Sequence, residues 1–393
     1  PLIDLQTLSQ RYKFSVDVLK SLQNVYGSDF ERVVQALKTP GRRYYFRVNT
    51  IKTSPDEVVE RFGKRGLSVK KHPAIEEAVY LDVEGPFEIP IHNQKIVVDK
   101  LTAESVLQGA HVYAPGVVKC QKIRRNQKVT VVDDEGQPVA SGVTRMDETG
   151  ILKYRHGLAV EVTSSSYKVP SLRETDEFEL GLIYPQSFPA ILTSRILDPQ
   201  CNEEIVDLNC APGGKLSHIS ALMQNTGRII GVDRNQRKIS TARENVKRLG
   251  CSNVTLVAHD SRYFDLDFPD VKADRCIVDP PCSALGVMPK LYEYASTDEI
   301  LALAKYQKQF LKVASNIVKP DGVVVYSVCT TTLEECEAVA QFALQSCGLT
   351  LERQELFFGE QGFKLYPSAV LTQRFHPHKH DAGYFIARFR KTA

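Results

Sequence analysis

The C-terminal half of the chain alternates short apolar runs with amphipathic segments, and this pattern constrains the fold most. The runs at 205–208, 228–233 and 254–258 are short and rich in Val and Ile, and helix-like segments separate them. Strands that alternate with helices build a mostly parallel sheet with helices on both faces. The sequence therefore predicts a doubly wound, Rossmann-like α/β domain over residues 171–393.

Two cysteines each follow a predicted strand of this domain. Segment 277–282 is an apolar run that stops at Asp279, two prolines and Cys282. Prolines fix φ and remove backbone donors, so neither a strand nor a helix continues there. Cys329 follows the apolar run 323–328. Because open α/β sheets bind ligands at the carboxyl ends of their strands, we expect both thiols to face one pocket.

Acidic residues end the other predicted strands and indicate a nucleotide-like cofactor. Gly213 lies in the turn after the first strand, and Asp233 ends the second strand 20 residues later, where an acid can contact ribose hydroxyls. The turn lacks the glycine spacing of a dinucleotide site and the Walker-type motif. The layout predicts an S-adenosylmethionine site, with Asp233 on the ribose and Asp260 at the adenine edge. Asp207 and Lys215 would lie at the methionine end.

Residues 1–92 and residues 93–170 differ from the C-terminal domain in their pattern of predicted helices and strands. The first segment predicts two amphipathic helices within 5–38, followed by a small α/β unit. That unit is either RRM-like or a structural extension of the catalytic domain. The second segment has short β-branched runs and a hairpin signal at 133–136, which predict an inserted β-rich domain.

A run of basic residues without an acid lies in the β-rich segment. Such a run is most often a solvated face, but its place beside the Gly-Pro-rich loop 109–117 also suits a surface that binds RNA phosphates. Residues 1–170 carry 25 Lys and Arg against 20 Asp and Glu (+5), whereas residues 171–393 carry 25 against 27 (−2). The run consists of Lys119, Lys122, Arg124, Arg125 and Lys128.

The composition excludes several classes of protein. The chain is 42% hydrophobic and 25% charged, and it has no apolar run long enough to span a membrane. Its nine cysteines form no C-x-x-C pair, which argues against a disulfide framework and a zinc module. His376, His378 and His380 lack a further ligand at a known spacing, so no metal is predicted. We expect a cytoplasmic monomer.

Three motifs resemble the Nol1/Nop2/Sun (Nsun) family of RNA cytosine-5 methyltransferases. They are D-L-N-C-A-P-G-G-K at 207–215, V-D-P-P-C-S at 278–283 and S-V-C-T-T-T at 327–332. The closing segment 375–389 is similar too, and the loop at 109–118 looks like the PUA domain of the subgroup that methylates tRNA near its acceptor end. The resemblance covers nearly the whole chain, and a compact chain without tryptophan suits an archaeal homologue.

The resemblance implies covalent catalysis. Carbon 5 of cytosine is too weak a nucleophile to take a methyl group directly, and a thiolate added to carbon 6 activates it. By resemblance, Cys329 attacks, Cys282 assists proton removal and release, and Asp279 contacts the base edge beside Lys215. From the residues alone the two cysteines could exchange roles, because DNA cytosine-5 methyltransferases attack with the Pro-Cys thiol.

The layout and the resemblance together define the expected binding residues. For RNA, Tyr113 joins the five basic residues of the run. The expected cofactor-binding residues are Asp207, Ala211, Pro212, Gly213, Gly214, Lys215, Asp233, Arg234, Lys238, Asp260 and Asp279.

The expected function is transfer of a methyl group from S-adenosylmethionine to carbon 5 of a cytosine near the tRNA 3′ end. By the subgroup's target this would be position 72, with the acceptor stem and CCA end held by the PUA domain. Two alternatives stay open: an rRNA cytosine-5 methyltransferase with the same core, and a non-catalytic tRNA-binding protein. The second is disfavoured because a dead site need not keep both thiols and the cofactor acids.

Overall fold

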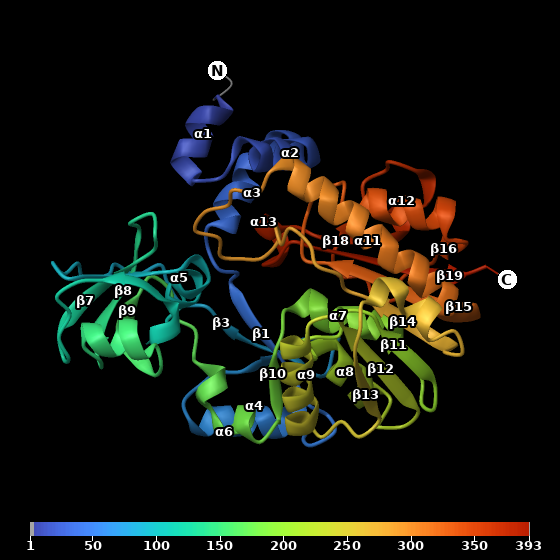
Figure 1. Cartoon of the computed structure of the whole chain (residues 1–393), viewed down its shortest axis with the longest axis horizontal. Helices are drawn as coiled ribbons and strands as arrows, with labels where there is room; N and C mark the ends of the chain where they lie inside the picture. Colours follow the sequence, from blue (N-terminus) through green and yellow to red (C-terminus); the bar gives the residue numbers. More distant parts are fainter. Residues whose placement is uncertain (1–3, 393) are drawn as a thin grey trace.

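The computed structural model describes residues 4–392, and three sheets of four, six and nine strands organise them (Figure 1). The PUA-like insert lies to one side, and the nine-stranded sheet with its helices forms the largest body (Figure 1). The predicted fold class is confirmed: a Rossmann-like domain, a β-rich insert and a small N-terminal α/β body.

The N-terminal body begins with three helices, where the sequence predicted two. The additional helix is α1, and Ser15 then caps α2 by accepting from the Val18 N–H. Ser54 likewise caps α4, as its position before Pro55 predicts. The elements are α1 (Leu5–Tyr12), α2 (Val16–Tyr26), α3 (Phe30–Leu37), β1 (Arg43–Val48), α4 (Pro55–Lys64), β2 (Lys70–Lys71) and β3 (Ala78–Asp82).

The four-stranded sheet has the order β10-β1-β3-β2, so a strand from beyond the insert completes it. This strand, β10 (Ile183–Pro185), pairs antiparallel with β1. The segment that links the insert to the Rossmann-like domain also contains the short helix α6 (Asp176–Glu179). The chain therefore returns through the N-terminal body before it enters the nine-stranded sheet.

The insert is a six-stranded sheet with the order β5-β9-β8-β7-β4-β6. Its predicted hairpin joins β7 to β8, and Asp133 Oδ1 accepts from the N–H groups of Glu135 and Gln137 in the turn. The elements are β4 (Lys95–Val98), α5 (Lys100–Val106), β5 (Val112–Tyr113), β6 (Val117–Cys120), β7 (Lys128–Val132), β8 (Pro138–Thr144) and β9 (Leu158–Ser165).

The Rossmann-like domain has the strand order β13-β12-β11-β14-β15-β19-β18-β17, with β16 paired to β19. Strands β11 to β15 are parallel, and β19 runs antiparallel to β15. The strands are β11 (Glu204–Asp207), β12 (Arg228–Asp233), β13 (Val254–Ala258), β14 (Ala273–Val278), β15 (Val318–Val328), β16 (Leu349–Leu351), β17 (Glu360–Gln361), β18 (Gln373–Phe375) and β19 (Tyr384–Lys391).

Helices cover both faces of this sheet (Figure 1). Strand β15 contains an irregularity at 319–322, where its register against β14 shifts. The helices are α7 (Phe188–Leu197), α8 (Gly214–Leu222), α9 (Gln236–Leu249), α10 (Phe264–Asp267), α11 (Thr297–Ile317), α12 (Glu337–Ser346) and α13 (Pro377–His380).

Glu77 joins the N-terminal body to the Rossmann-like domain. Its side chain is 1% exposed and accepts from Arg195 Nε and Nη2, both at 2.6 Å. His218 Nε2 lies 2.7 Å from Glu77 Oε1. Although burial opposes ionisation, the bonds from His218 and Arg195 hold the pKa of Glu77 below its usual range.

We expect Glu77→Ala to lower the free energy of unfolding by roughly 3–5 kcal/mol, because it leaves buried partners uncompensated. Urea titration would measure the change. Glu76→Ala is the matched control, since Glu76 is the exposed neighbour. A loss below about 1 kcal/mol in Glu77→Ala would contradict a stabilising contact here.

Candidate active site

The two predicted thiols lie together at adjacent strand ends. Strands β14 and β15 are parallel neighbours, with Val278 paired to Tyr326. The residues that follow these strands bring Cys282 Sγ to 3.4 Å from Cys329 Sγ. Both side chains line one cavity of about 340 Å³, together with Asp279. The expectation that both thiols face one pocket is met.

An ion pair lies beside the thiols. Lys215 Nζ donates to Asp279 Oδ2 at 2.5 Å, and Ser327 Oγ donates to Asp279 Oδ1 at 3.0 Å. Tyr384 on β19 donates to Ser327 Oγ at 3.3 Å. Burial opposes the positive charge of Lys215, but the nearby Asp279 carboxylate raises the pKa of this lysine above its usual value. The carboxylate is thus held from two sides, with its remaining lone pairs available to a ligand.

The hydrogen bond between the thiols makes them unequal. An S–H donated by Cys282 lowers the pKa of Cys329 below its usual range, while burial opposes this effect. The same bond, with burial, raises the pKa of Cys282 well above its usual range. The positive charges of Lys215 and Lys290 also favour a Cys329 thiolate. These two directions favour a thiolate at Cys329 over one at Cys282.

Alkylation should reveal this difference. We expect iodoacetamide to modify Cys329 with a half-maximal rate below pH 9.0, the ordinary value for a thiol. In Cys282→Ala the midpoint should move upward, because the S–H donor is lost. Mass spectrometry of peptides would resolve Cys329 from exposed Cys201, which serves as the internal reference for the reagent. An unchanged midpoint in the variant would contradict the assigned hydrogen bond.

A buried carboxyl group connects the segments that carry the two cysteines. Glu335 is fully buried. Its Oε1 accepts from the Ser283 N–H at 2.9 Å and from Gln307 Nε2 at 3.0 Å. Its Oε2 accepts from Ser283 Oγ at 2.5 Å and Thr332 Oγ1 at 2.8 Å. Since Ser283 follows Cys282 and Thr330 follows Cys329, this network fixes both thiol-bearing segments.

The sequence did not single out Glu335. It lies in the segment C-T-T-T-L-E-E-C at 329–336, where an acid after threonines is ordinarily a turn or helix-cap residue. The signal that could have found it is the pair of hydroxyl residues, Ser283 and Thr330, placed directly after each cysteine. Such residues can share one buried acceptor when two strand ends meet.

The predicted cofactor residues, except Gly213, line two adjacent cavities that share lining residues. The cavity at the cysteines is also lined by Ala211, Asp233, Arg234, Lys238 and Asp260. A smaller cavity of about 160 Å³ is lined by Asp207, Pro212, Gly214 and Lys215. Asn209 and Asp279 line both. Gly213 lines neither cavity. It is the N-cap residue of α8, and its φ of +104° is a backbone conformation that favours glycine.

These residues fit S-adenosylmethionine. The buried Asn209 Oδ1 has no hydrogen-bond partner within residues 4–392, which suits a donor from a ligand. A Cβ built on Gly214 would lie 2.8 Å from Tyr184 Cε1, so only glycine fits beside this ring in the lining of the smaller cavity. Burial raises the pKa of Asp207 to about 7, and a cationic ligand group would offset that penalty.

The predicted RNA contacts lie on the insert, away from the cysteines. The five basic residues of the run are all exposed, on β6, β7 and the loop between them. Tyr113 lies on β5, at the opposite end of the strand order, and its hydroxyl donates to Glu174 Oε1 at 3.2 Å. The structure thus brings the thiols and cofactor acids together, but it gives Tyr113 and the basic run separate positions in the sheet.

Residues 4–392 show neither a metal site nor a membrane-spanning helix. They contain no group of three or more His, Cys, Asp or Glu side chains arranged to hold a metal ion. His376 instead lies 3.2 Å from Glu360 and contacts the Tyr26 hydroxyl. None of the helices in this part of the chain is both long and apolar enough to cross a membrane. All nine cysteines are free thiols.

Comparison with known proteins identifies three domains. Residues 194–390 match the 16S rRNA methyltransferase RsmB/F model, residues 94–165 match the PUA domain, and residues 18–88 match the ferredoxin-like domain of RsmF/B-like methyltransferases.

Relatives cover almost the whole chain. A tRNA (cytosine(72)-C(5))-methyltransferase of Pyrococcus horikoshii is 40% identical, over 96% of this chain and 97% of its own. The human tRNA (cytosine(72)-C(5))-methyltransferase NSUN6 is 29% identical, over 85% and 79% respectively. The crystal structure of NSun6 from Pyrococcus horikoshii with SFG, an S-adenosylmethionine analogue, superposes with a TM-score of 0.89 at 39% identity, over 97% of this chain and 99% of that one. The chain belongs to the RsmB/F (Nol1/Nop2/Sun) family of RNA cytosine-5 methyltransferases, which take the methyl group from S-adenosylmethionine.

Proposed function

We propose that this protein methylates carbon 5 of cytosine 72 in tRNA. The observation that carries the proposal is the thiol pair, 3.4 Å apart, beside the Lys215–Asp279 ion pair. Two thiols and a carboxylate are the groups that methylation of a cytosine carbon requires. The choice of tRNA rests on the identity with the Pyrococcus horikoshii and human relatives and on the PUA domain.

In the proposed mechanism Cys329 is the nucleophile. Its thiolate adds to carbon 6 of the cytosine, and the ring electrons move to carbon 5. Asp279, held by Lys215 and Ser327, accepts a hydrogen bond from the N4 amino group at the N3/N4 edge of the base and orients it. S-adenosylmethionine supplies the electrophilic methyl group when bound.

Cys282 completes the reaction. After methyl transfer the C5 proton must leave. The electron pair of the broken C5–H bond then forms the C5=C6 double bond and expels the Cys329 thiolate from carbon 6. Cys282 lies 3.4 Å from Cys329 and is therefore placed to take part in the proton transfer. This assignment follows from the unequal acidity of the two thiols as well as from the family resemblance.

The cofactor would lie across the strand ends. Asp233 is assigned to the ribose, Asp260 to the adenine edge, and Asp207 with Lys215 to the methionine end. The supporting observation is that one cavity is lined by Asp260 and Asp279, and the adjacent one by Asp279 and Asp207. Arg234 and Lys238 would contact the adenosine half from the wall that they line.

The remaining assignments follow from the same arrangement. The insert at 93–170, with Tyr113 and the basic run, would bind the acceptor stem and CCA end. Residues 1–92 and 171–393 would form the N-terminal body and the methyltransferase domain. Free thiols at all nine cysteines support a reducing, cytoplasmic setting. We propose that the enzyme acts as a monomer.

Methyl transfer to defined RNAs tests the proposal. We expect labelled methyl from S-adenosylmethionine to enter a tRNA transcript with cytosine at position 72 and not one with uridine there. Transfer to rRNA fragments but not to tRNA would favour the rRNA methyltransferase instead. Cofactor binding by calorimetry without transfer to either RNA would contradict both activities.

A further inference from the structure

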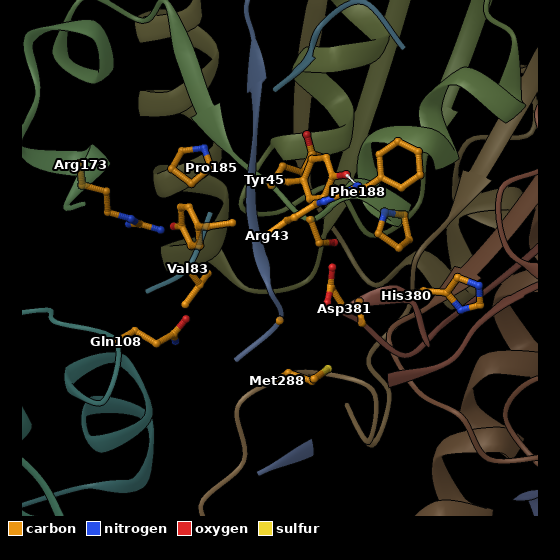
Figure 2. Close-up of a pocket in the computed structure, with 16 residues that line it drawn as sticks. Arg43, Tyr45, Val83, Gln108, Arg173, Pro185, Phe188, Met288, His380 and Asp381 are labelled. Atoms are coloured by element: carbon orange, nitrogen blue, oxygen red, sulfur yellow. Dashed lines mark hydrogen bonds between the residues drawn. The ribbon is translucent and has the colours of Figure 1, made fainter. Parts of the chain in front are cut away.

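A third cavity, which we call the junction cavity, lies where the three bodies of the molecule meet (Figure 2). Its volume is about 320 Å³, large enough to hold part of a nucleotide. Arg43 and Tyr45 reach it from β1, Gln108 from the insert, and Arg173 from the segment after the insert. Met288, from the segment that follows Cys282, closes another side (Figure 2).

The cavity contains two guanidinium groups that no carboxylate neutralises. Within residues 4–392, neither Arg43 nor Arg173 has an acidic side chain at ion-pair distance, and both are exposed. Arg43 donates to the Tyr45 hydroxyl at 3.4 Å and lies 4.8 Å from the centre of the Tyr80 ring, so aromatic contacts hold its side chain. Figure 2 shows the Arg173 side chain directed into the space beside Val83.

The one acid of the lining is already paired. Asp381 Oδ1 accepts from the Arg42 N–H at 2.9 Å and from Arg42 Nε at 3.2 Å. The charges of Arg43 and Arg173 therefore remain available to an anion. Guanidinium groups present paired N–H donors whose geometry matches phosphate oxygens.

The cavity adjoins the reaction centre through Gln186. This residue lines both the junction cavity and the small cavity that contains Lys215 and Asp279. Its Oε1 accepts from Nε of the buried Arg47 at 3.0 Å, which fixes its position. A strand of RNA whose target base reaches Asp279 would therefore leave its neighbouring backbone close to Arg43 and Arg173.

We propose that the junction cavity binds a backbone phosphate of the RNA strand that carries the target base, through Arg43 and Arg173. The site is distinct from the basic run on the insert and acts nearer the chemistry. It fixes the strand after the base has left its stack, which helps to offset the unstacking cost. This inference rests on the proposed function and adds the backbone contact beside the active site.

Salt dependence of tRNA binding tests the proposal. The tRNA-binding constant K of Arg43→Ala, Arg173→Ala and the double variant would be measured by fluorescence anisotropy at salt concentrations from low to moderate. Each lost phosphate contact should reduce the slope of log K against log salt by about 1, and by about 2 in the double variant. Arg173→Lys should recover most of the slope but less of the affinity, because the lysine ammonium keeps the charge but lacks the paired N–H donors of the guanidinium.

Arg61→Ala is the matched control, because it removes one half-buried arginine on α4, which does not line the cavity and whose partner is Glu57. The binding of S-adenosylmethionine, measured by calorimetry, should be unchanged in every variant. A double variant with the slope of Arg61→Ala would overturn the inference. If wild-type protein methylates tRNA in the same preparation, the proposed function stands and only the phosphate site fails; if it does not, the proposed function fails first.

Discussion

Replacing Cys329 with alanine should abolish methyl transfer, whereas replacing Cys282 with alanine should trap the enzyme on its RNA. Without the Cys329 thiolate, carbon 5 of cytosine is not activated, and the rate should fall by on the order of 10⁴-fold or more. Without Cys282, addition and methylation can still occur, but release is blocked. A covalent protein–RNA adduct should then accumulate, visible as a band of lower mobility on a denaturing gel.

The outcome also assigns the two roles independently of the family. Adduct in Cys329→Ala, with none in Cys282→Ala, would mean that the Pro-Cys thiol attacks and that the cysteines have exchanged roles. Cys201→Ala is the control, because this thiol is exposed and does not line the cavity. The 3.4 Å separation allows either thiol to reach the same carbon, so geometry alone leaves the adduct as the decisive observation.

The sequence was sufficient for the parts of the site that depend on local pattern. Asp279 and Cys282 follow β14, which two prolines stop, and Cys329 directly follows the apolar run of the neighbouring strand β15. Parallel strands then carry both thiols to one edge of the sheet, whatever the rest of the chain does. This is why the predicted thiols, and the acids at Asp207 and Asp233, line two cavities that share Asp279.

Other features of the structure depend on contacts between segments that are distant in the sequence, and no local sequence pattern predicts these features. Strand β10 completes the N-terminal sheet although the insert separates it from β1 in the sequence. The junction cavity needs Arg43, Arg173 and Met288 from three parts of the chain, and each residue is unremarkable in its own segment. Their meeting is a property of the tertiary fold.

The arrangement places the proposed RNA-binding residues and the thiols on different domains. The basic run lies on β6, β7 and the loop between them in the insert, whereas the thiols lie in the segments that follow β14 and β15 of the Rossmann-like domain. The segment after Cys282 connects the two, because the Leu291 N–H donates to Glu104 Oε1 on α5 at 3.0 Å. Lys290 in this segment forms an ion pair with Glu293 and contributes to the acidity of Cys329. Docking of the insert therefore bears on the charge beside the thiols.

Glu335→Ala should impair catalysis more than it impairs binding. Loss of the carboxyl group leaves the Ser283 N–H and Gln307 amide without their acceptor, at about 1–3 kcal/mol for each buried group. The segments that carry the thiols are then free to separate, and a displacement of about 1 Å in reacting groups can cost about 100-fold in rate. We expect kcat to fall by about that factor, with KM for S-adenosylmethionine little changed.

The conservative variant separates position from stability. In Glu335→Gln the amide oxygen can still accept from the Ser283 N–H, and the hydroxyls of Ser283 and Thr332 can rotate to accept from the amide nitrogen. We therefore expect kcat within about tenfold of wild type, and the alkylation midpoint of Cys329 near that of wild type. In Glu335→Ala that midpoint should rise, because the S–H of Cys282 no longer holds the thiolate. Glu334→Ala, on the adjacent residue outside the network, should change neither quantity. Equal kcat in wild type and Glu335→Ala would show that the thiols keep their geometry without this carboxyl group.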